Sequence, residues 1–204
     1  MAKLLPKEQS ERVKNIVFAK ADAHGYLTRG RNENGKFIDA LVDDPEVGEV
    51  LSSFMGKGKV RTHIKDGILN QYPKAKTKKI LNGILPTDTI QKVYSSTTNV
   101  IQTESDITVC RSDDGKIFVV SSGNFLKWET ALKKALELIA REPNLVVDGN
   151  TPEICLQLVV LNYSITDGDK TLITDALNAI GVKAVFLSNG FGGDLNGKNA
   201  RNNT

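Results

Sequence analysis

The sequence contains few of the residues from which disulfide and zinc sites are built. Among its 204 residues there are only 2 cysteines and 2 histidines. Cys110 and Cys155 both lie inside apolar runs typical of strands, without CxxC or Cys/His spacing. We therefore expect two buried thiols of a reducing compartment, and neither a disulfide nor a zinc site.

The sequence also lacks a long apolar run. The run ICLQLVVL at residues 154–161 is far shorter than the roughly 20 residues that a membrane-spanning helix needs. Near the N-terminus the apolar residues stop at Pro6 and charged residues follow, which does not fit a secretory signal. These features predict a cytoplasmic protein. Neither GxGxxG nor a P-loop occurs, and there is no internal repeat.

Positive charge is concentrated in one stretch. Residues 1–95 carry 17 Lys and Arg against 11 Asp and Glu, whereas residues 96–204 carry 10 against 13. Between Gly56 and Asn82 there are 8 basic residues and one acidic residue, Asp66, a net charge of +7 over 27 residues. Cations at this density repel one another unless an anionic partner neutralises them. The segment predicts that the protein binds a polyanion.

The clearest structural pattern runs from Gln102 to Arg141. Apolar and polar residues alternate over 107–110, which predicts a half-buried strand, and Ser-Asp-Asp-Gly at 112–115 is typical of a hairpin turn. The apolar run 117–120 predicts an inner return strand. From Phe125 to Ile139 apolar residues recur at helical spacing. We expect a β-hairpin with a helix packed on it.

The last third of the chain predicts a parallel crossover. Residues 154–161 have the pattern of a strand, 167–180 that of a helix closed by Gly181, and 182–187 that of a final strand. The helix residues expected to face inward are Leu172, Ile173, Ala176, Leu177 and Ile180. The fold class is therefore α/β, a mixed β-sheet with an antiparallel hairpin and a parallel crossover, flanked by helices. This core should cover 96–188, followed by a disordered tail at 189–204.

Residues 1–95 are expected to form a mainly helical, basic, DNA-binding region. Helices are predicted over 8–23 and 37–42, from Asp44 onward, and over 60–72 up to Pro73. Between the first two we expect a flexible basic loop or short hairpin at 26–36, and a connection should run from Pro86 to Ser96. Two short helices across the turn at 56–58 have the proportions of a helix-turn-helix. The residues expected to contact DNA phosphates are Lys57, Lys59, Arg61, Lys65, Arg29 and Arg31.

This order of elements resembles the PD-(D/E)XK nuclease superfamily, the fold of many type II restriction endonucleases. The residues that carry the resemblance lie in Glu104–Arg141. In that family an Asp that opens the second strand binds a divalent metal, and Asp106 stands in that position. The next strand of the family has an acid, any residue and a lysine, where this chain has Ser121, Ser122 and Gly123.

The resemblance implies Mg²⁺-dependent hydrolysis of double-stranded DNA, by a homodimer where the target is a palindrome. Some members of the family carry the acid on the following helix, which nominates Glu129 as the second metal ligand beside Asp106. Lys127 would supply the missing cation, and Ser121 or Ser122 would support the site. Such hydrolysis needs a hard cation held by two or more oxygen ligands, so the site depends on whether Asp106 and Glu129 converge.

The same residues also have ordinary structural interpretations. Asp106 can end a turn, Ser121 can end a strand, and Glu129 can form an ion pair with Lys133 one helical turn further on. Three functions therefore stay open. They are a Mg²⁺-dependent endonuclease of restriction type, a non-catalytic DNA-binding protein on the same frame, and an α/β domain that binds a small molecule near residues 162–169.

Overall fold

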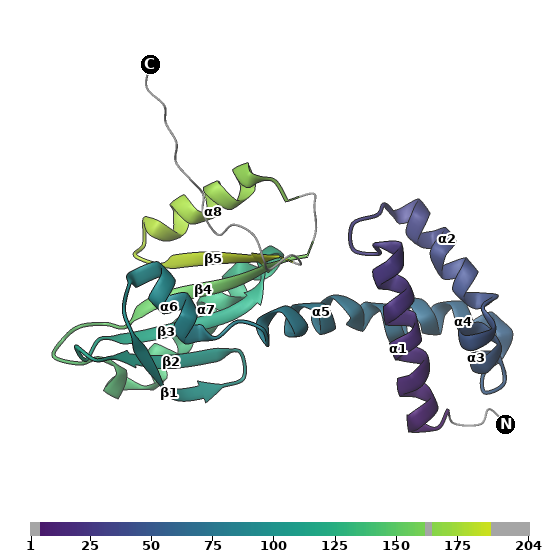
Figure 1. Cartoon of the computed structure of the whole chain (residues 1–204), viewed down its shortest axis with the longest axis horizontal. Coiled ribbons are helices and arrows are strands. Elements are labelled where there is room, and N and C mark those ends of the chain that lie inside the picture. Colours follow the sequence, from purple (N-terminus) through teal and green to yellow (C-terminus); the bar gives the residue numbers. More distant parts are fainter. Residues whose placement is uncertain (1–4, 162–164, 189–204) are drawn as a thin grey trace, which may run out of the picture. The chain divides into compact units, whose positions relative to one another are not determined.

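The computed structural model describes residues 5–161 and 165–188. They form two compact units, shown in Figure 1. The first unit holds the residues up to Gly83 together with Leu161–Thr171, and the second holds Ile84–Val160 and the residues from Leu172. The tail expected at 189–204 lies outside the described residues. None of the described helices is both long and apolar enough to cross a membrane.

The second unit is built on a five-stranded mixed sheet in the order β1-β2-β3-β4-β5. The strands are β1 (Thr98–Glu104), β2 (Ile107–Ser112), β3 (Ile117–Asn124), β4 (Glu153–Val160) and β5 (Lys183–Ser188). The first three are antiparallel neighbours, and β3, β4 and β5 are parallel. The predicted α/β fold with a mixed sheet, hairpin and parallel crossover is confirmed.

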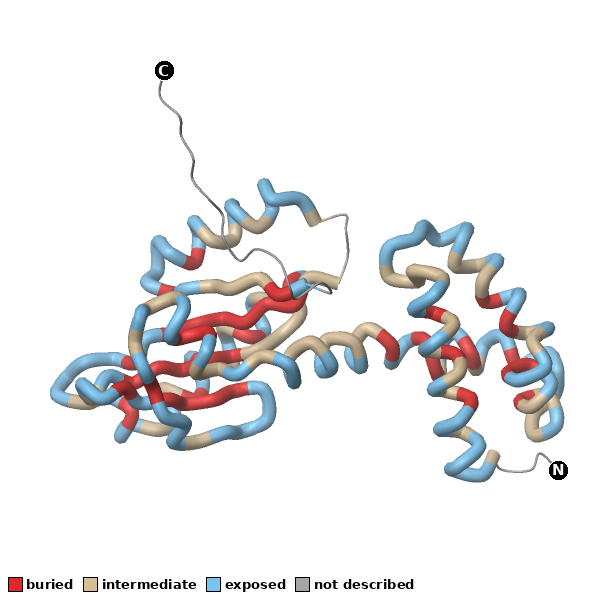
Figure 2. Tube along the Cα trace, in the orientation of Figure 1, coloured by how far each residue is buried: buried red, intermediate tan, exposed pale blue. Residues whose placement is uncertain are grey.

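Helices cover both faces of this sheet. The helices are α6 (Pro86–Tyr94), α7 (Trp128–Arg141) and α8 (Asp167–Asn178), with short 3₁₀ turns η4 (Phe125–Lys127) and η5 (Pro143–Leu145). On one face, Ala135 of α7 and Leu177 of α8 join a core with Val119. On the other face, Ile90 of α6 packs with Phe118. The central strands are accordingly the most buried part of this unit (Figure 2).

Helix α6 and strand β1 were not predicted. The connection expected from Pro86 to Ser96 is wrong, because the chain there is helical as far as Tyr94. Pro86 suits the first turn of a helix, where a missing N–H costs nothing. Since α6 covers the second face, the four residues Ile107–Cys110 are all buried and β2 is not the half-buried strand that its alternation indicated.

The inward face of α8 differs from the predicted one. Leu177 is buried and Ile173 packs against the core, but Ala176 is exposed, and Leu172 and Ile180 are 71% and 62% exposed. The helix ends at Asn178, before Ile180, and Gly181 adopts the predicted left-handed conformation with φ 76°. Successive helical residues are about 100° apart, so a helix that rests on one sheet face turns part of its apolar residues to solvent.

The first unit consists of helices around one apolar core. Its helices are α1 (Lys7–His24), α2 (Arg31–Val42), α3 (Val50–Ser52), α4 (Lys57–Thr62) and α5 (Tyr72–Leu81), with π-helical segments η1 (Pro45–Glu49) and η2 (His63–Ile68) and a 3₁₀ turn η3 (Leu69–Gln71). Val17, Leu51 and Ile64 are fully buried in this core. A Cβ at Gly48 would lie 1.8 Å from the carbonyl oxygen of Val42, so only glycine fits where η1 meets the end of α2.

Two predictions for this unit are wrong. The loop or hairpin expected at 26–36 is helical from Arg31 onward, because Glu33 receives the backbone N–H of Gly30 and closes the first turn of α2. Pro73 does not end a helix either. It lies in the first turn of α5, so that helical backbone continues from Lys57 to Leu81.

A buried network of side-chain hydrogen bonds connects α6 to the sheet. Gln157, in β4, is 1% exposed. Its side-chain Oε1 accepts a hydrogen bond from Ser122 Oγ of β3 at 2.8 Å, and its Nε2 donates to Thr89 Oγ1 of α6 at 2.6 Å. An amide in this position stabilises the fold only while both ends are paired, because an unpaired buried polar group is costly.

Replacing Gln157 with leucine should destabilise the second unit by about 1 to 3 kcal/mol, since it leaves the hydroxyls of Ser122 and Thr89 without their partner. Trp128 is the only tryptophan and lies in this unit, so its fluorescence during urea unfolding measures the effect. Gln102→Leu on the edge strand β1 is the control and should change stability by no more than about 0.5 kcal/mol. Equal stability of Gln157→Leu and wild type would contradict the assigned role.

Candidate nucleic-acid interface and acidic hairpin

Asp106 lies in the tight turn between β1 and β2. Ser105, which precedes it, has a positive φ of 55°. The carboxylate of Asp106 accepts a hydrogen bond from Lys134 Nζ of α7 at 2.8 Å, and both side chains are about half exposed. The backbone oxygen of Asp106 accepts the N–H of Ser122 at 2.8 Å. The predicted metal ligand is thus engaged by a cation from the helix above the sheet.

Ser121 lies beneath α7. It is fully buried, and its Oγ has no hydrogen-bond partner among the described residues. It alternates along β3 with Ser122, whose hydroxyl points to Gln157 on the opposite face. At Gly123, on the same face as Ser121, a Cβ would lie 3.2 Å from that of Ala131 of α7. The strand positions where the nuclease family has an acid and a lysine are therefore covered by a helix here.

Glu129 and Lys127 lie at the N-terminal end of α7, and both are exposed. Within the described residues neither forms an ion pair. The structure pairs Lys133 with Glu137 at 3.5 Å, and not with Glu129. Lys134, not Lys127, is the cation that reaches Asp106. Helical spacing alone did not distinguish these neighbouring lysines, because either can approach a turn next to the helix.

In this structure the predicted metal ligand Asp106 is engaged by Lys134. Across residues 5–161 and 165–188, no group of three or more His, Cys, Asp or Glu side chains is placed to hold a metal ion. Asp106 would have to release Lys134 before it could bind a cation.

Half of the cations predicted to contact DNA are bound within the protein. The guanidinium of Arg29 donates to the carbonyl oxygen of His24 at 2.6 Å and to Glu33 at 2.7 Å. Arg61 Nε donates to Asp39 at 2.6 Å. Lys65 Nζ lies 3.7 Å from the carboxylate of Asp66, the next residue. The remaining predicted cations, Arg31, Lys57 and Lys59, are exposed and form no ion pair with any described residue.

Three further cations on α5 belong with this group. Lys74, Lys78 and Lys79 are exposed and form no ion pair within the described part of the chain. They were part of the basic segment but were not predicted as contacts. The signal was present, since no acidic residue occurs between Asp66 and Asp88. An acid-free run on a helix leaves its cations without intrahelical partners.

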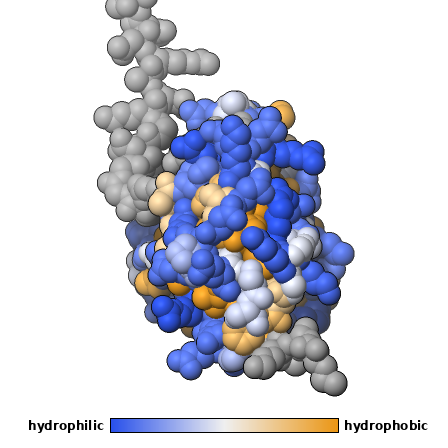
Figure 3. Space-filling model, turned by 90° about the vertical axis from the view of Figure 1, so that its right-hand side faces the viewer, coloured by the Kyte–Doolittle hydropathy of each residue, from blue (hydrophilic) through white to orange (hydrophobic). Residues whose placement is uncertain are grey.

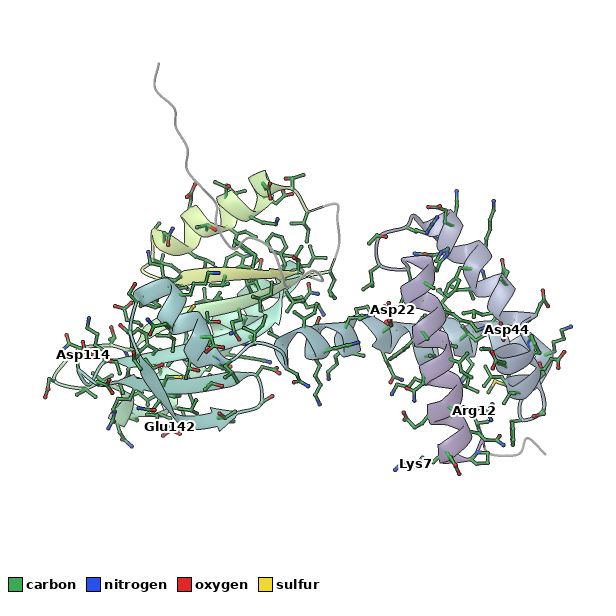
Figure 4. The ribbon with its side chains drawn as sticks, viewed as in Figure 1. Lys7, Arg12, Asp22, Asp44, Asp114 and Glu142 are labelled. Carbon is green, nitrogen blue, oxygen red and sulfur yellow. The ribbon has the colours of Figure 1, made fainter. Side chains whose placement is uncertain are left out.

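The fourth lysine of α5, Lys76, has a structural role. Lys76 and the hydroxyl of Tyr72 both donate to the carboxylate of Asp22 on α1, which is labelled in Figure 4. Partial burial raises the pKa of Asp22, but these two hydrogen bonds outweigh it and hold the pKa below its usual value. Ionised Asp22 therefore helps to fix α5 against α1.

The pair between Asp22 and Lys76 should make the first unit less stable in acid. A lowered folded-state pKa contributes stability above the unfolded value of about 3.8, and this stability is lost as the pH falls through the folded pKa. Asp22→Asn should therefore show a flatter pH dependence than wild type below about pH 4 in urea unfolding followed by circular dichroism. Asp175→Asn on α8 is the control. Parallel pH profiles for Asp22→Asn and wild type would argue against the contribution.

The exposed face of the first unit carries mostly hydrophilic side chains around a strip of apolar atoms (Figure 3). A pocket of about 260 Å³ lies between α1 and the η1–α3 segment, lined by Gln9, Arg12, Val13, Pro45, Glu46 and Val50. No predicted site residue lines it. The small-molecule site expected at 162–169 lies partly outside the described residues, and its described part is an N-terminal turn in which Thr166 Oγ1 donates to Asp169 at 2.7 Å.

Comparisons with models of protein families, with curated proteins and with solved structures found no match for this chain. The resemblance of Glu104–Arg141 to the PD-(D/E)XK nucleases therefore stays a prediction from the residues alone.

Proposed function

We propose that this protein binds DNA through the phosphate backbone, using the helical first unit. The observation that carries the proposal is a set of exposed lysines on α4 and α5 that form no ion pair with any described residue: Lys57, Lys59, Lys74, Lys78 and Lys79. Because they form no ion pair within the described residues, their mutual repulsion favours a polyanion as partner. The cytoplasmic location and the homodimer expected with DNA binding stay predictions.

The contacts and burial at the hairpin favour the non-catalytic form of this proposal over the Mg²⁺-dependent endonuclease. The carboxylate of Asp106 is engaged by Lys134, and Ser121 is buried beneath α7. Each would have to move before a metal and a phosphodiester could meet there. The endonuclease is retained as the alternative, with its own test below.

Removing the lysines of α5 should weaken DNA binding and lower its salt dependence. Each phosphate contact contributes about −0.9 to the slope of log K against log salt. The slope should therefore become less negative by about 2.7 in the triple variant Lys74→Gln, Lys78→Gln, Lys79→Gln. Fluorescence anisotropy over about 50 to 200 mM salt measures it. The control carries the same charge change on the second unit, at Lys116, Lys127 and Lys133. A similar loss in both triple variants would contradict a site on α5.

Cleavage distinguishes the two forms of the proposal. Plasmid and phage DNA incubated with the protein and Mg²⁺ or Mn²⁺ at low salt should be retarded but uncut, and Asp106→Ala should behave in the same way. The substitution removes one exposed ion pair, worth at most about 1 kcal/mol, so the variant should fold. Discrete fragments that disappear in Asp106→Ala would establish the endonuclease and place its site on the hairpin.

A further inference from the structure

We infer that the proposed surface binds double-stranded DNA through its phosphates, with no preference for base sequence, and that internal ion pairs decide which cations take part. The inference rests on the proposed function and adds that the DNA is double-stranded, that its base sequence is not read, and that internal ion pairs limit the cations available. Three observations on the first unit carry it.

Of the three arginine, asparagine and glutamine side chains of Lys57–Leu81, Arg61 and Gln71 are engaged within the protein and Asn70 is exposed. Bidentate contacts from arginine, asparagine or glutamine to base edges supply most direct readout of sequence. Arg61 is the only arginine between Lys57 and Leu81, and it is held by Asp39. Gln71 donates its amide to the carbonyl oxygen of Gly67 at 2.6 Å. The cations that remain are lysines, which act on phosphate as point charges and carry little sequence information.

The aromatic rings of residues 5–83 are poorly placed to stack on unpaired bases. Proteins that bind single strands place exposed aromatic side chains along a basic groove. Here all five aromatic residues of 5–83 are buried or half-buried, and four of them contact other rings. Phe18 and Tyr72 have ring centroids 5.2 Å apart, and Tyr26 lies 5.9 Å from Phe37. The described surface of the unit therefore suits the regular backbone of a duplex better than a single strand.

The lysines are spread over a length comparable with one turn of DNA. Helical backbone is continuous from Lys57 to Leu81, and α4 and α5 lie along one line in Figure 1. At about 1.5 Å per residue, Lys57 and Lys79 are separated by about 33 Å. One turn of B-DNA is about 34 Å, or 10 base pairs, so the stretch that carries the lysines matches one turn of a duplex in length.

The ion pair between Arg61 and Asp39 limits the available charge. Both side chains are about half exposed, so the pair itself contributes little stability. Asp39→Asn would release the guanidinium of Arg61 within the row of lysines without removing any cation. We therefore expect this substitution to strengthen binding, in contrast to the lysine substitutions.

The test measures anisotropy of the full chain with three unrelated duplexes of about 20 base pairs and with their separate strands, at about 50 to 200 mM salt. The three duplexes should bind within about threefold of one another and more tightly than the single strands, with a slope of about −0.9 for each lysine that contacts a phosphate. Asp39→Asn should raise the magnitude of the slope by about 0.9. Asp175→Asn, which makes the same charge change on α8, should leave it unaltered.

The outcomes separate this inference from the proposed function. One duplex bound at least about tenfold more tightly than the others, or single strands bound more tightly than duplexes, would overturn the inference and leave DNA binding intact. An unchanged slope in Asp39→Asn would overturn the role of the ion pair. Absence of binding to every DNA at the lowest salt would sink the proposed function itself.

Discussion

The hydrogen-bonded amide of Gln157 is the contact on which the arrangement of the second unit depends. It joins β4, at the centre of the parallel part of the sheet, to β3 on one side and to α6 above. The apolar residues around it include Ile90, Phe118 and Cys155. Their burial supplies the larger share of the free energy of folding, but the hydrophobic effect is not directional. Because the amide is satisfied in one placement of α6, it selects that placement.

A comparable selection operates on the charges of the first unit. The acids at Asp22, Glu33 and Asp39 each form an ion pair with one cation, and the two exposed pairs, at Glu33 and Asp39, add at most about 1 kcal/mol of stability each. Their larger effect is on which cations can bind phosphate, since a cation that is already paired with a carboxylate binds a phosphate less favourably. The exposed lysines of α4 and α5 form no ion pair within the described residues, and they carry the proposed binding of DNA.

At the hairpin the strand order expected for a nuclease occurs together with an ion pair on the predicted metal ligand, Asp106. A metal site needs at least two oxygen ligands that converge in space. Asp106 and Glu129 belong to a turn and to the following helix, and neither is part of a three-residue metal-ligating group among the described residues. The contact of Ala131 with Gly123 brings α7 close to β3, which leaves no room for larger side chains there.

The sequence by itself determined the elements whose signals are local. Alternation and turn residues predicted the hairpin, helical spacing predicted α1 and α7, and Gly25, Gly115 and Gly181 stand at positive φ where turns or helix ends were expected. The concentration of positive charge was also readable from the sequence. These features depend on neighbours along the chain, and a single sequence contains them.

Only the tertiary structure decided which helix faces are buried and which charged side chains are paired. Helix α6 was missed because its nine residues carry few apolar side chains and gain stability by covering the sheet. Leu172 is exposed because α8 meets the sheet along one line, and Arg61 is paired because α2 brings Asp39 beside it. Each of these outcomes depends on a partner remote in the chain, and local patterns along the sequence carry no information about such partners.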